Sequence, residues 1–210
     1  MKMNKGLVLV ISGPSGVGKG TIINKLLGDD KNMHLSISCT TRAPRPGEQE
    51  GVNYFYKTEE EFAEMVKNNE FLEYASVFGL ASYGTPMSQI NLRNEGTDVL
   101  LEIDVQGAEN VKKLIPDAVM IMIAPPSFET LRNRLIGRGT ETPEKIAKRL
   151  NTAGKELSYS DQYDYVVVND DLDVAINDIR NIVHAEKIKL AGKAAAEKII
   201  AEIEEYGIVK

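Results

Sequence analysis

The sequence predicts an α/β fold in which helices cover a mostly parallel sheet. Apolar runs rich in branched residues alternate with helical patterns along much of the chain, as in sheets that are buried on both faces. A glycine-rich stretch follows the first run, where such sheets often bind phosphate. With 210 residues and 42% hydrophobic content, the chain can bury one core and still carry inserted subdomains.

The apolar runs are the candidate strands. They are Leu7–Ile11, Leu35–Ser38, Val99–Val105, Val119–Ile123 and Tyr165–Val168. The candidate helices are Lys19–Leu27, Gly107–Leu114, Phe128–Ile136, Pro143–Leu157 and a long segment from Leu172 to about Glu205. The last segment carries isoleucines near helical spacing, which more often means packing than partner binding. We expect its end to cover the core, with a dimer contact as the alternative.

The first apolar run leads into a stretch that predicts a phosphate-binding loop. It reads Gly13-Pro14-Ser15-Gly16-Val17-Gly18-Lys19-Gly20-Thr21. The glycines allow backbone conformations that other residues avoid, so successive N–H groups can converge on an anion at the start of the helix. Lys19 adds a full positive charge there. A plain glycine-rich turn is the alternative, and the strand before the motif and the helix after it argue against that interpretation.

Two segments interrupt the alternation of strands and helices. Between about Ser38 and Ile90 the pattern breaks into a basic, proline-rich loop and several short strands and helices. From Pro125 to about Ser160 a helical segment gathers basic residues and suits a lid over phosphates. We therefore expect one domain with a core of residues 1–37, 91–125 and 161–210, an insertion of residues 38–90, and a lid of residues 126–160.

Composition excludes several other classes of protein. A single cysteine, Cys39, rules out an internal disulfide and is expected to be a small buried group. Two isolated histidines, His34 and His184, predict no metal cluster. A net charge of −6 argues against a general nucleic-acid surface. No window predicts a membrane span or a secretory signal, so we expect a cytoplasmic protein.

A phosphate loop, an insertion and an arginine-rich lid are typical of nucleoside-monophosphate kinases, and further segments closely resemble the guanylate kinase family. The matching segments are Gly13–Thr21, Ser38–Glu48, Gly51–Tyr56, Phe71–Ala75, Tyr83–Pro86, Glu102–Gly107, Gly137–Thr140 and Val168–Asp171. They run from about residue 6 to residue 184 in the family's order. The resemblance implies a P-loop core with a GMP-binding insertion and a lid. It also implies magnesium-dependent transfer of the terminal phosphate of ATP to GMP, and to dGMP, in purine metabolism.

The resemblance also implies the residues of a GMP site. They are Ser38, Arg42, Arg45, Tyr54, Glu73, Tyr83, Thr85 and Asp104. The arginines and tyrosines are expected on the phosphate, and Ser38, Glu73 and Thr85 on the base. Arg42 and Arg45 offer planar forks that match phosphate oxygens. Two solvated surface arginines are the alternative when the residues are considered alone.

For ATP, the resemblance implies the phosphate loop, the lid arginines and the turn after the last strand. The expected contacts are Gly13, Pro14, Ser15, Gly16, Val17, Gly18, Lys19, Gly20, Thr21, Arg134, Arg138, Asn169 and Asp170. The expected catalytic residues are Lys19, Arg42, Arg138 and Arg149. Arg134 and Arg138 are four residues apart and would share one helix face. A plain turn is the alternative for Asn169 and Asp170.

Magnesium is expected at Thr21 and Asp104, directly or through water. The phosphate-loop pattern has Ser or Thr directly after the lysine, but this chain has Gly20 there and carries the hydroxyl on Thr21. Glu102 and Asp104 lie two apart in an expected strand, so both side chains should point toward the edge where ligands collect. For Glu102, capping of the following helix is the alternative to a role at the metal or at GMP.

Two rival functions and one departure remain open. Some guanylate-kinase-like domains are scaffolds that bind phosphopeptides without catalysis, and a kinase could also take another nucleoside monophosphate. The intact Lys19, Arg138 and Arg149 argue against a scaffold. The segment from Phe78 to Thr85 is one residue longer than the family pattern. The expected partners are ATP and GMP, with no nucleic acid or membrane, and the chain is expected to be a monomer or a homodimer.

Overall fold

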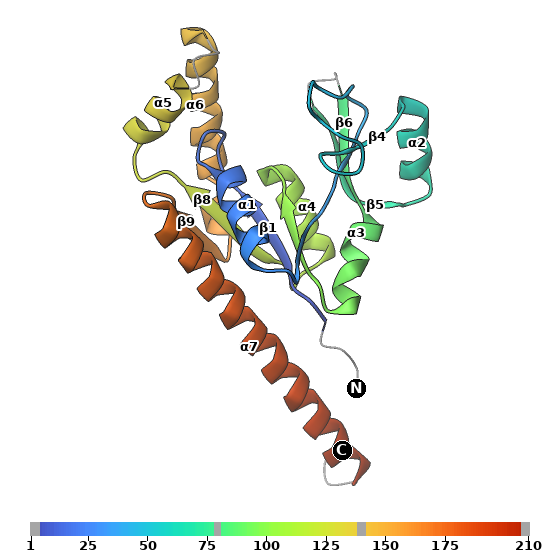
Figure 1. Cartoon of the computed structure of the whole chain (residues 1–210). Helices are drawn as coiled ribbons and strands as arrows, with labels where there is room; N and C mark the ends of the chain where they lie inside the picture. Colours follow the sequence, from blue (N-terminus) through green and yellow to red (C-terminus); the bar gives the residue numbers. More distant parts are fainter. Residues whose placement is uncertain (1–4, 78–80, 138–141, 207–210) are drawn as a thin grey trace.

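The centre of the computed structural model is a five-stranded parallel sheet (Figure 1). Its strands stand in the order β2 (Met33–Leu35), β7 (Asp98–Glu102), β1 (Val8–Ser12), β8 (Val119–Ala124) and β9 (Tyr165–Val168). Each neighbouring pair is parallel. The structure describes residues 5–77, 81–137 and 142–206. The predicted α/β class with a parallel sheet is confirmed.

Helices cover both faces of this sheet. They are α1 (Lys19–Asp29), α3 (Met87–Asn91), α4 (Val105–Leu114) and α7 (Leu172–Glu205), with the 3₁₀ turn η1 (Leu92–Glu95) after α3. Leu9 and Ile11 of β1 pack with α1 and α7, whereas Val8 and Val10 pack with α4 on the other face. All four side chains are fully buried. A strand covered on both faces must be apolar at every position, which explains the continuous apolar run.

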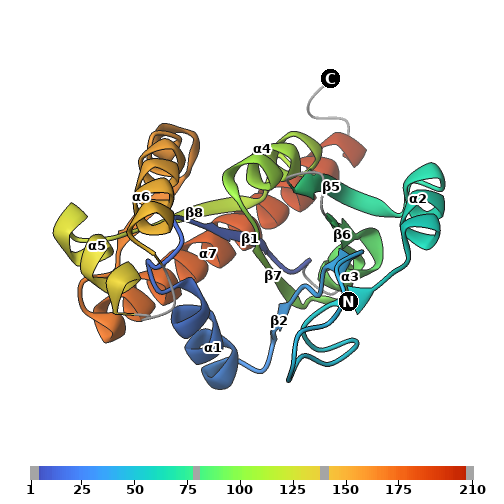
Figure 2. The same cartoon turned by 90° about the horizontal axis from the view of Figure 1, so that it is seen from above.

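A second, four-stranded sheet stands beside the core (Figure 2). Its order is β4 (Phe55–Tyr56), β3 (Cys39–Thr40), β6 (Ala81–Pro86) and β5 (Phe71–Val77). Helix α2 (Glu59–Lys67) packs on it through Phe62, whose ring stacks on Phe71 with the centroids 4.5 Å apart. Cys39 lies in the same cluster and is 1% exposed, so the prediction of a small buried group is confirmed.

On the opposite side of the core stand α5 (Phe128–Ile136) and α6 (Pro143–Leu157), followed by the 3₁₀ turn η2 (Ser160–Gln162) (Figure 2). The two helices hold each other through a small apolar cluster of Leu131, Leu135 and Ala153. Side-chain oxygens of Ser127 and Thr142 cap their N-termini. The core therefore carries one separately packed unit on each side.

Three elements differ from the sequence prediction. The second strand is Met33–Leu35 rather than Leu35–Ser38, since the chain turns toward the second sheet after Leu35. The strand expected over Val99–Val105 ends at Glu102, and α4 already begins at Val105. Asp104 is the N-cap of α4 and not a strand residue.

The third difference concerns the end of α7. Ile176, Ile179 and Val183 are buried against the core, but Ile199 and Ile200 are 56% and 54% exposed. The helix leaves the body and projects beyond it (Figure 1). The prediction that its end covers the core is therefore wrong, because the sheet is shorter than the helix. Across the described part of the chain, no helix is both long and apolar enough to cross a bilayer.

Candidate active site

The glycine-rich stretch forms a tight loop between β1 and α1. Gly13, Gly16 and Gly18 have φ values of 141°, 92° and 103°, in the region that side chains disfavour. A Cβ at Gly13 would also lie 2.3 Å from the carbonyl oxygen of Ile123. The loop therefore needs glycine for both its backbone conformation and its close approach to β8, as its sequence predicts.

Basic side chains from three elements converge on this loop. The Nζ of Lys19 donates to the carbonyl oxygens of Gly13 at 2.5 Å and Pro14 at 3.4 Å. From α6, Arg149 donates to the hydroxyl of Ser15 at 3.1 Å. From α5, Arg134 donates to the carbonyl of Val17 at 3.3 Å and to that of Asn169 at 3.0 Å. The loop thus sits among cations that suit a polyphosphate.

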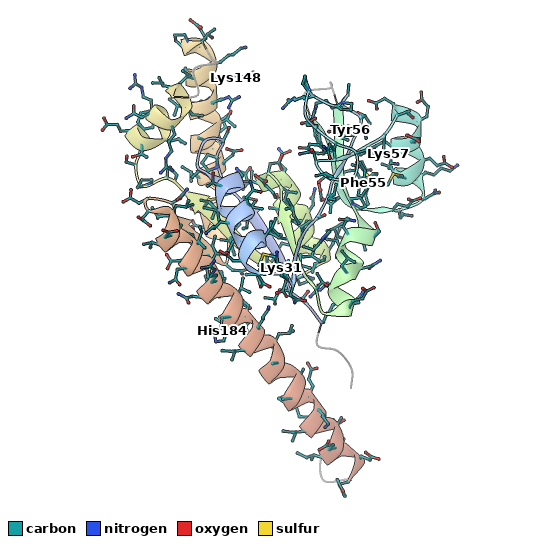
Figure 3. The ribbon with its side chains drawn as sticks, in the orientation of Figure 1. Lys31, Phe55, Tyr56, Lys57, Lys148 and His184 are labelled. Carbon is teal, nitrogen blue, oxygen red and sulfur yellow. The ribbon has the colours of Figure 1, made fainter. Side chains whose placement is uncertain are left out.

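Three other residues expected to contact ATP are Gly20, Thr21 and Arg138. Arg138 lies outside the residues that the structure describes. Gly20 and Thr21 are exposed in the first turn of α1. Figure 3 shows Lys148 on α6 and Tyr56 on β4, on the two arms that flank the core.

Asn169 holds the phosphate loop from the end of β9. Its side-chain amide donates to the carbonyl of Val17 at 2.8 Å, and the residue is only 6% exposed. The same amide nitrogen lies 2.5 Å from where a Cβ on Gly18 would stand. Asp170 is exposed. These two residues were predicted together as a nucleotide contact, but their surroundings differ. Asn169 is buried and holds the loop, whereas Asp170 is exposed to solvent.

We expect Asn169→Ala to lower the free energy of unfolding by about 1–3 kcal/mol, because it strips a buried carbonyl of its donor. Asp170→Ala is the matched control and should change stability by less than about 0.5 kcal/mol. Urea denaturation of the two variants and the parent measures the difference. Equal stability of both variants would show that the Asn169 contact contributes nothing.

A pocket of about 270 Å³ lies between the two sheets. It brings together Ser38, Tyr54, Glu73, Tyr83 and Asp104, all predicted for one site. Glu102, Ile103 and Gly107 also line it. The pocket therefore gathers residues from five separate segments of the sequence.

Glu73 lines this pocket, whereas Thr85, also predicted for the site, is fully buried and is not among the lining residues. They lie opposite each other in the β5–β6 pairing, and the Thr85 hydroxyl donates to Glu73 Oε1 at 2.7 Å. Burial raises the pKa of Glu73, and the charge of Asp104 adds to this, while the Thr85 hydrogen bond opposes it. The second oxygen, Oε2, lies close to Gly107, where a Cβ would approach it to 3.3 Å. Glu73 therefore presents an acceptor group to the pocket, and Thr85 holds it in place.

Arg42 lies beside Tyr54, which lines the pocket, and is held by Glu48. Its Nη2 contacts both oxygens of Glu48 at 2.9 Å, and its guanidinium stands 5.4 Å from the centre of the Tyr54 ring. Glu48 also accepts from the Arg45 backbone at 2.8 Å and from the Tyr56 hydroxyl at 2.9 Å. The Arg45 N–H, followed by Arg42 and Tyr56, lowers the pKa of Glu48 to about 2. The Arg45 side chain is exposed.

Asp104 and Glu102 do not share a strand, contrary to the prediction. Asp104 accepts from the backbone N–H of Gly107 at 2.9 Å and so caps α4. The capping alternative considered for Glu102 thus applies to Asp104. Both residues still line one pocket, because β7 ends at Glu102 and the chain turns there.

Two functional candidates were missed by sequence reasoning. Glu48 lies inside a segment that matched the family, but only the arginines there suggested chemistry. Glu156 lies on the last turn of α6, and burial raises its pKa. The positive charge of Lys19 lowers this pKa, and the negative charge of Asp104 raises it. No signal in the basic helix around it pointed to a carboxylate near Lys19.

Comparison with known proteins identifies the relatives of this chain. The family model described as Guanylate kinase matches residues 5–186. A guanylate kinase from Caldanaerobacter subterraneus subsp. tengcongensis is 53% identical over 89% of this chain and 90% of its own length. One from Clostridioides difficile is 47% identical over 91% and 93%. The crystal structure of guanylate kinase from Anaplasma phagocytophilum aligns with a TM-score of 0.70 at 38% identity, covering 89% of this chain and 88% of that one.

Proposed function

This chain belongs to the guanylate kinase family and phosphorylates GMP with ATP, and we propose the residues that carry each part of the reaction. The observation that supports this assignment most directly is one contact. The Ser12 hydroxyl donates to the carbonyl of Ile103 at 2.8 Å and links the phosphate loop to the lining of the pocket. Because β1 and β7 are adjacent parallel strands with Ile11 opposite Glu102, both segments leave the same edge of the sheet.

On the ATP side, we propose that the loop backbone and Lys19 bind the phosphates. Phosphoryl transfer depends on positioning and charge neutralisation more than on covalent chemistry. The carbonyls that Lys19 now contacts would give way to phosphate oxygens, which are stronger partners for an ammonium group. Arg134, Arg138 and Arg149 add positive charge from the lid. Asp170 is the candidate contact for the adenine, with Asn169 holding the loop.

On the GMP side, we propose that Glu73, Thr85 and Ser38 read the base while Arg42, Arg45, Tyr54 and Tyr83 bind the phosphate. Guanine presents N1–H and the 2-amine as two adjacent donors, which a buried carboxylate can accept together. We propose that the Glu48 carboxylate orients Arg42. Its two contacts with the guanidinium hold Arg42 against the Tyr54 ring.

Magnesium fits the donors available at the site. Thr21 offers a hydroxyl and Asp104 a carboxylate, the hard oxygen ligands that this ion prefers alongside several waters. Since one oxygen of Asp104 accepts from Gly107, the other remains for a cation or for its bound water. When bound, the ion would neutralise charge on the transferring phosphates. We propose these two residues as its ligands, with Asp104 acting through water.

The two side units suit distinct tasks. We propose that residues 38–90 form the GMP-binding insertion and residues 126–160 the lid, around a core of residues 1–37, 91–125 and 161–210. Each unit has its own small apolar cluster, so it can move as a body. Closure of both would exclude water that could otherwise accept the phosphoryl group. We place this work in the cytoplasm, where purine nucleotides are interconverted.

A coupled assay of ADP release tests the assignment. With ATP and magnesium we expect rapid turnover with GMP, turnover with dGMP, and activity lower by about 10⁴-fold or more with AMP, CMP and UMP. The reason is that the wrong base would leave the buried Glu73 carboxylate without its donors. Comparable activity with AMP would contradict GMP as the substrate. Binding of GMP with no ADP release from any monophosphate would instead indicate a scaffold.

A further inference from the structure

Two crossings of the chain join the four-stranded sheet to the core. The first crossing is residues 36–38, which lead from β2 in the core sheet to β3 in the second sheet. The second crossing leads from the end of β6 into α3, the short helix that returns the chain toward β7 (Figure 1). Because the pocket proposed for GMP lies between the two sheets, the course of these crossings sets where its two sides stand.

The first crossing passes from one sheet to the other within three residues. The backbone N–H of Ser36 donates to the carbonyl of Leu100 in β7 at 2.8 Å, so Ser36 is still bound to the core sheet. The carbonyl of Ser38 accepts from the N–H of Phe55 at 2.9 Å, and Phe55 belongs to the second sheet (Figure 3). Ile37 is therefore the residue at which the chain leaves the core.

The side chain of Gln89 holds the backbone of Ile37. Gln89 lies in the middle of α3, and its Oε1 accepts from the N–H of Ile37 at 3.1 Å. The same oxygen lies 2.9 Å from Nε2 of His34 in β2. An amide oxygen only accepts, so His34 carries its proton on Nε2 and donates it. One oxygen thus receives two donors, and both contacts are partly buried, where water competes less for them.

The helix that carries Gln89 is itself anchored to the core. The next residue, Ile90, is 4% exposed and packs in one cluster with Val99 and Leu101 of β7. Leu72 of β5 lies in the same cluster, so the β5 edge of the second sheet also rests on the core. The contacts of Gln89 add a separate point of attachment at the first crossing.

We propose that Gln89 is a positioning residue for GMP and acts through Ser38. Ser38 lines the pocket and directly follows Ile37, so an anchored Ile37 backbone fixes where the Ser38 hydroxyl stands. Without the accepting oxygen, the first crossing would be free to turn at Ile37 and carry Ser38 away from the base. Gln89 does not line the pocket and acts without touching the nucleotide. This inference rests on the proposed role of Ser38 in reading GMP.

Steady-state kinetics of the full chain test the proposal. Gln89→Met keeps the length of the side chain but lacks the oxygen. It should raise the KM for GMP by about 10-fold, while kcat and the KM for ATP stay within about 2-fold. Gln89→Glu restores an accepting oxygen and should return the KM for GMP to near the parent value. Asn91→Ala removes an exposed carboxamide from the same helix and is the matched control.

Two kinetic outcomes would overturn the proposal. One is a KM for GMP in Gln89→Met equal to that in Asn91→Ala, which would show that the accepting oxygen does not matter. The other is an equal rise of the KM values for GMP and ATP, because a general loss of structure would affect both substrates.

A double-mutant cycle tests whether Gln89 acts through Ser38. Ser38→Ala alone should raise the KM for GMP. Adding Gln89→Met should then raise it by less than about 2-fold more, because the hydroxyl that Gln89 positions is already gone. If the two effects multiplied instead, Gln89 would act by another route and the proposal would be wrong.

NMR of the Ile37 amide separates this inference from the proposed function. The amide proton should shift upfield in Gln89→Met, because its hydrogen bond is lost, and should stay in place in Asn91→Ala. An unchanged shift in an active kinase would overturn the inference alone. A parent chain that fails to phosphorylate GMP would overturn the proposed function, and the inference with it.

Discussion

Replacing Lys19 with alanine should lower kcat by about 10²- to 10³-fold or more while leaving the protein folded. The side chain contributes the one full charge within the loop itself, and that charge follows the β- and γ-phosphates as they separate in the transition state. Its contacts in the present structure are with the carbonyls of Gly13 and Pro14, which solvent can replace. Steady-state kinetics with saturating ATP and GMP measure the loss.

Lys25→Ala is the matched control for this variant. Lys25 is an exposed lysine on the same helix, so its removal changes the net charge by the same amount without touching the loop. It should retain near-normal turnover, and circular dichroism should show both variants to be folded. If Lys19→Ala turned over as fast as Lys25→Ala, the loop would not be the site of phosphate transfer.

Replacing Glu73 with glutamine should remove most of the preference for GMP. Glutamine keeps the shape of the side chain but turns one acceptor into a donor, so guanine's two donors no longer meet two acceptors. We expect the KM for GMP to rise and kcat/KM to fall by about 10²-fold or more, because a buried polar group is then mispaired. The weak activity with AMP should fall less or rise, since its N1 is an acceptor.

Glu70→Gln controls for the loss of a negative charge in the same subdomain. Glu70 is exposed and stands just before β5, outside the pocket. The ratio of kcat/KM for GMP to that for AMP is the quantity to compare. If Glu73→Gln kept the parent ratio, another residue must read the base, and the assignment of Glu73 would be wrong.

The core of the fold could be predicted because its signals are local. Val8 to Ile11 is a continuous apolar run because both faces of this strand are covered, and the positive φ of Gly13, Gly16 and Gly18 requires the residue type found there. The turn after Glu102 had no such signal. Val105 extends the apolar pattern, and only the Asp104 contact with Gly107 reveals that a helix has begun.

The site was predicted as a set of residues but not as a set of contacts. Glu73 and Thr85 were expected separately on the base, and their hydrogen bond depends on the β5–β6 register, which is a tertiary property. Asn169 was predicted to contact the nucleotide. Its side-chain amide donates to the carbonyl oxygen of Val17, a residue far away in sequence, and no local signal predicts that contact. Glu156 reaches the neighbourhood of Lys19 only because α6 returns to the core.

The unbroken course of α7 bears on how local opening of this helix would affect the active site. The helix starts at Leu172, just after the turn that braces the phosphate loop, and runs for 34 residues. Its buried residues, Ala175, Ile176, Ile179 and Val183, lie in the same core cluster as Val17 of the loop. Opening of the first turns would therefore release the loop, whereas fraying of the exposed last turns would leave it undisturbed. In amide hydrogen exchange, the loop and the first half of α7 should be protected together, and the last turns of the helix should exchange sooner.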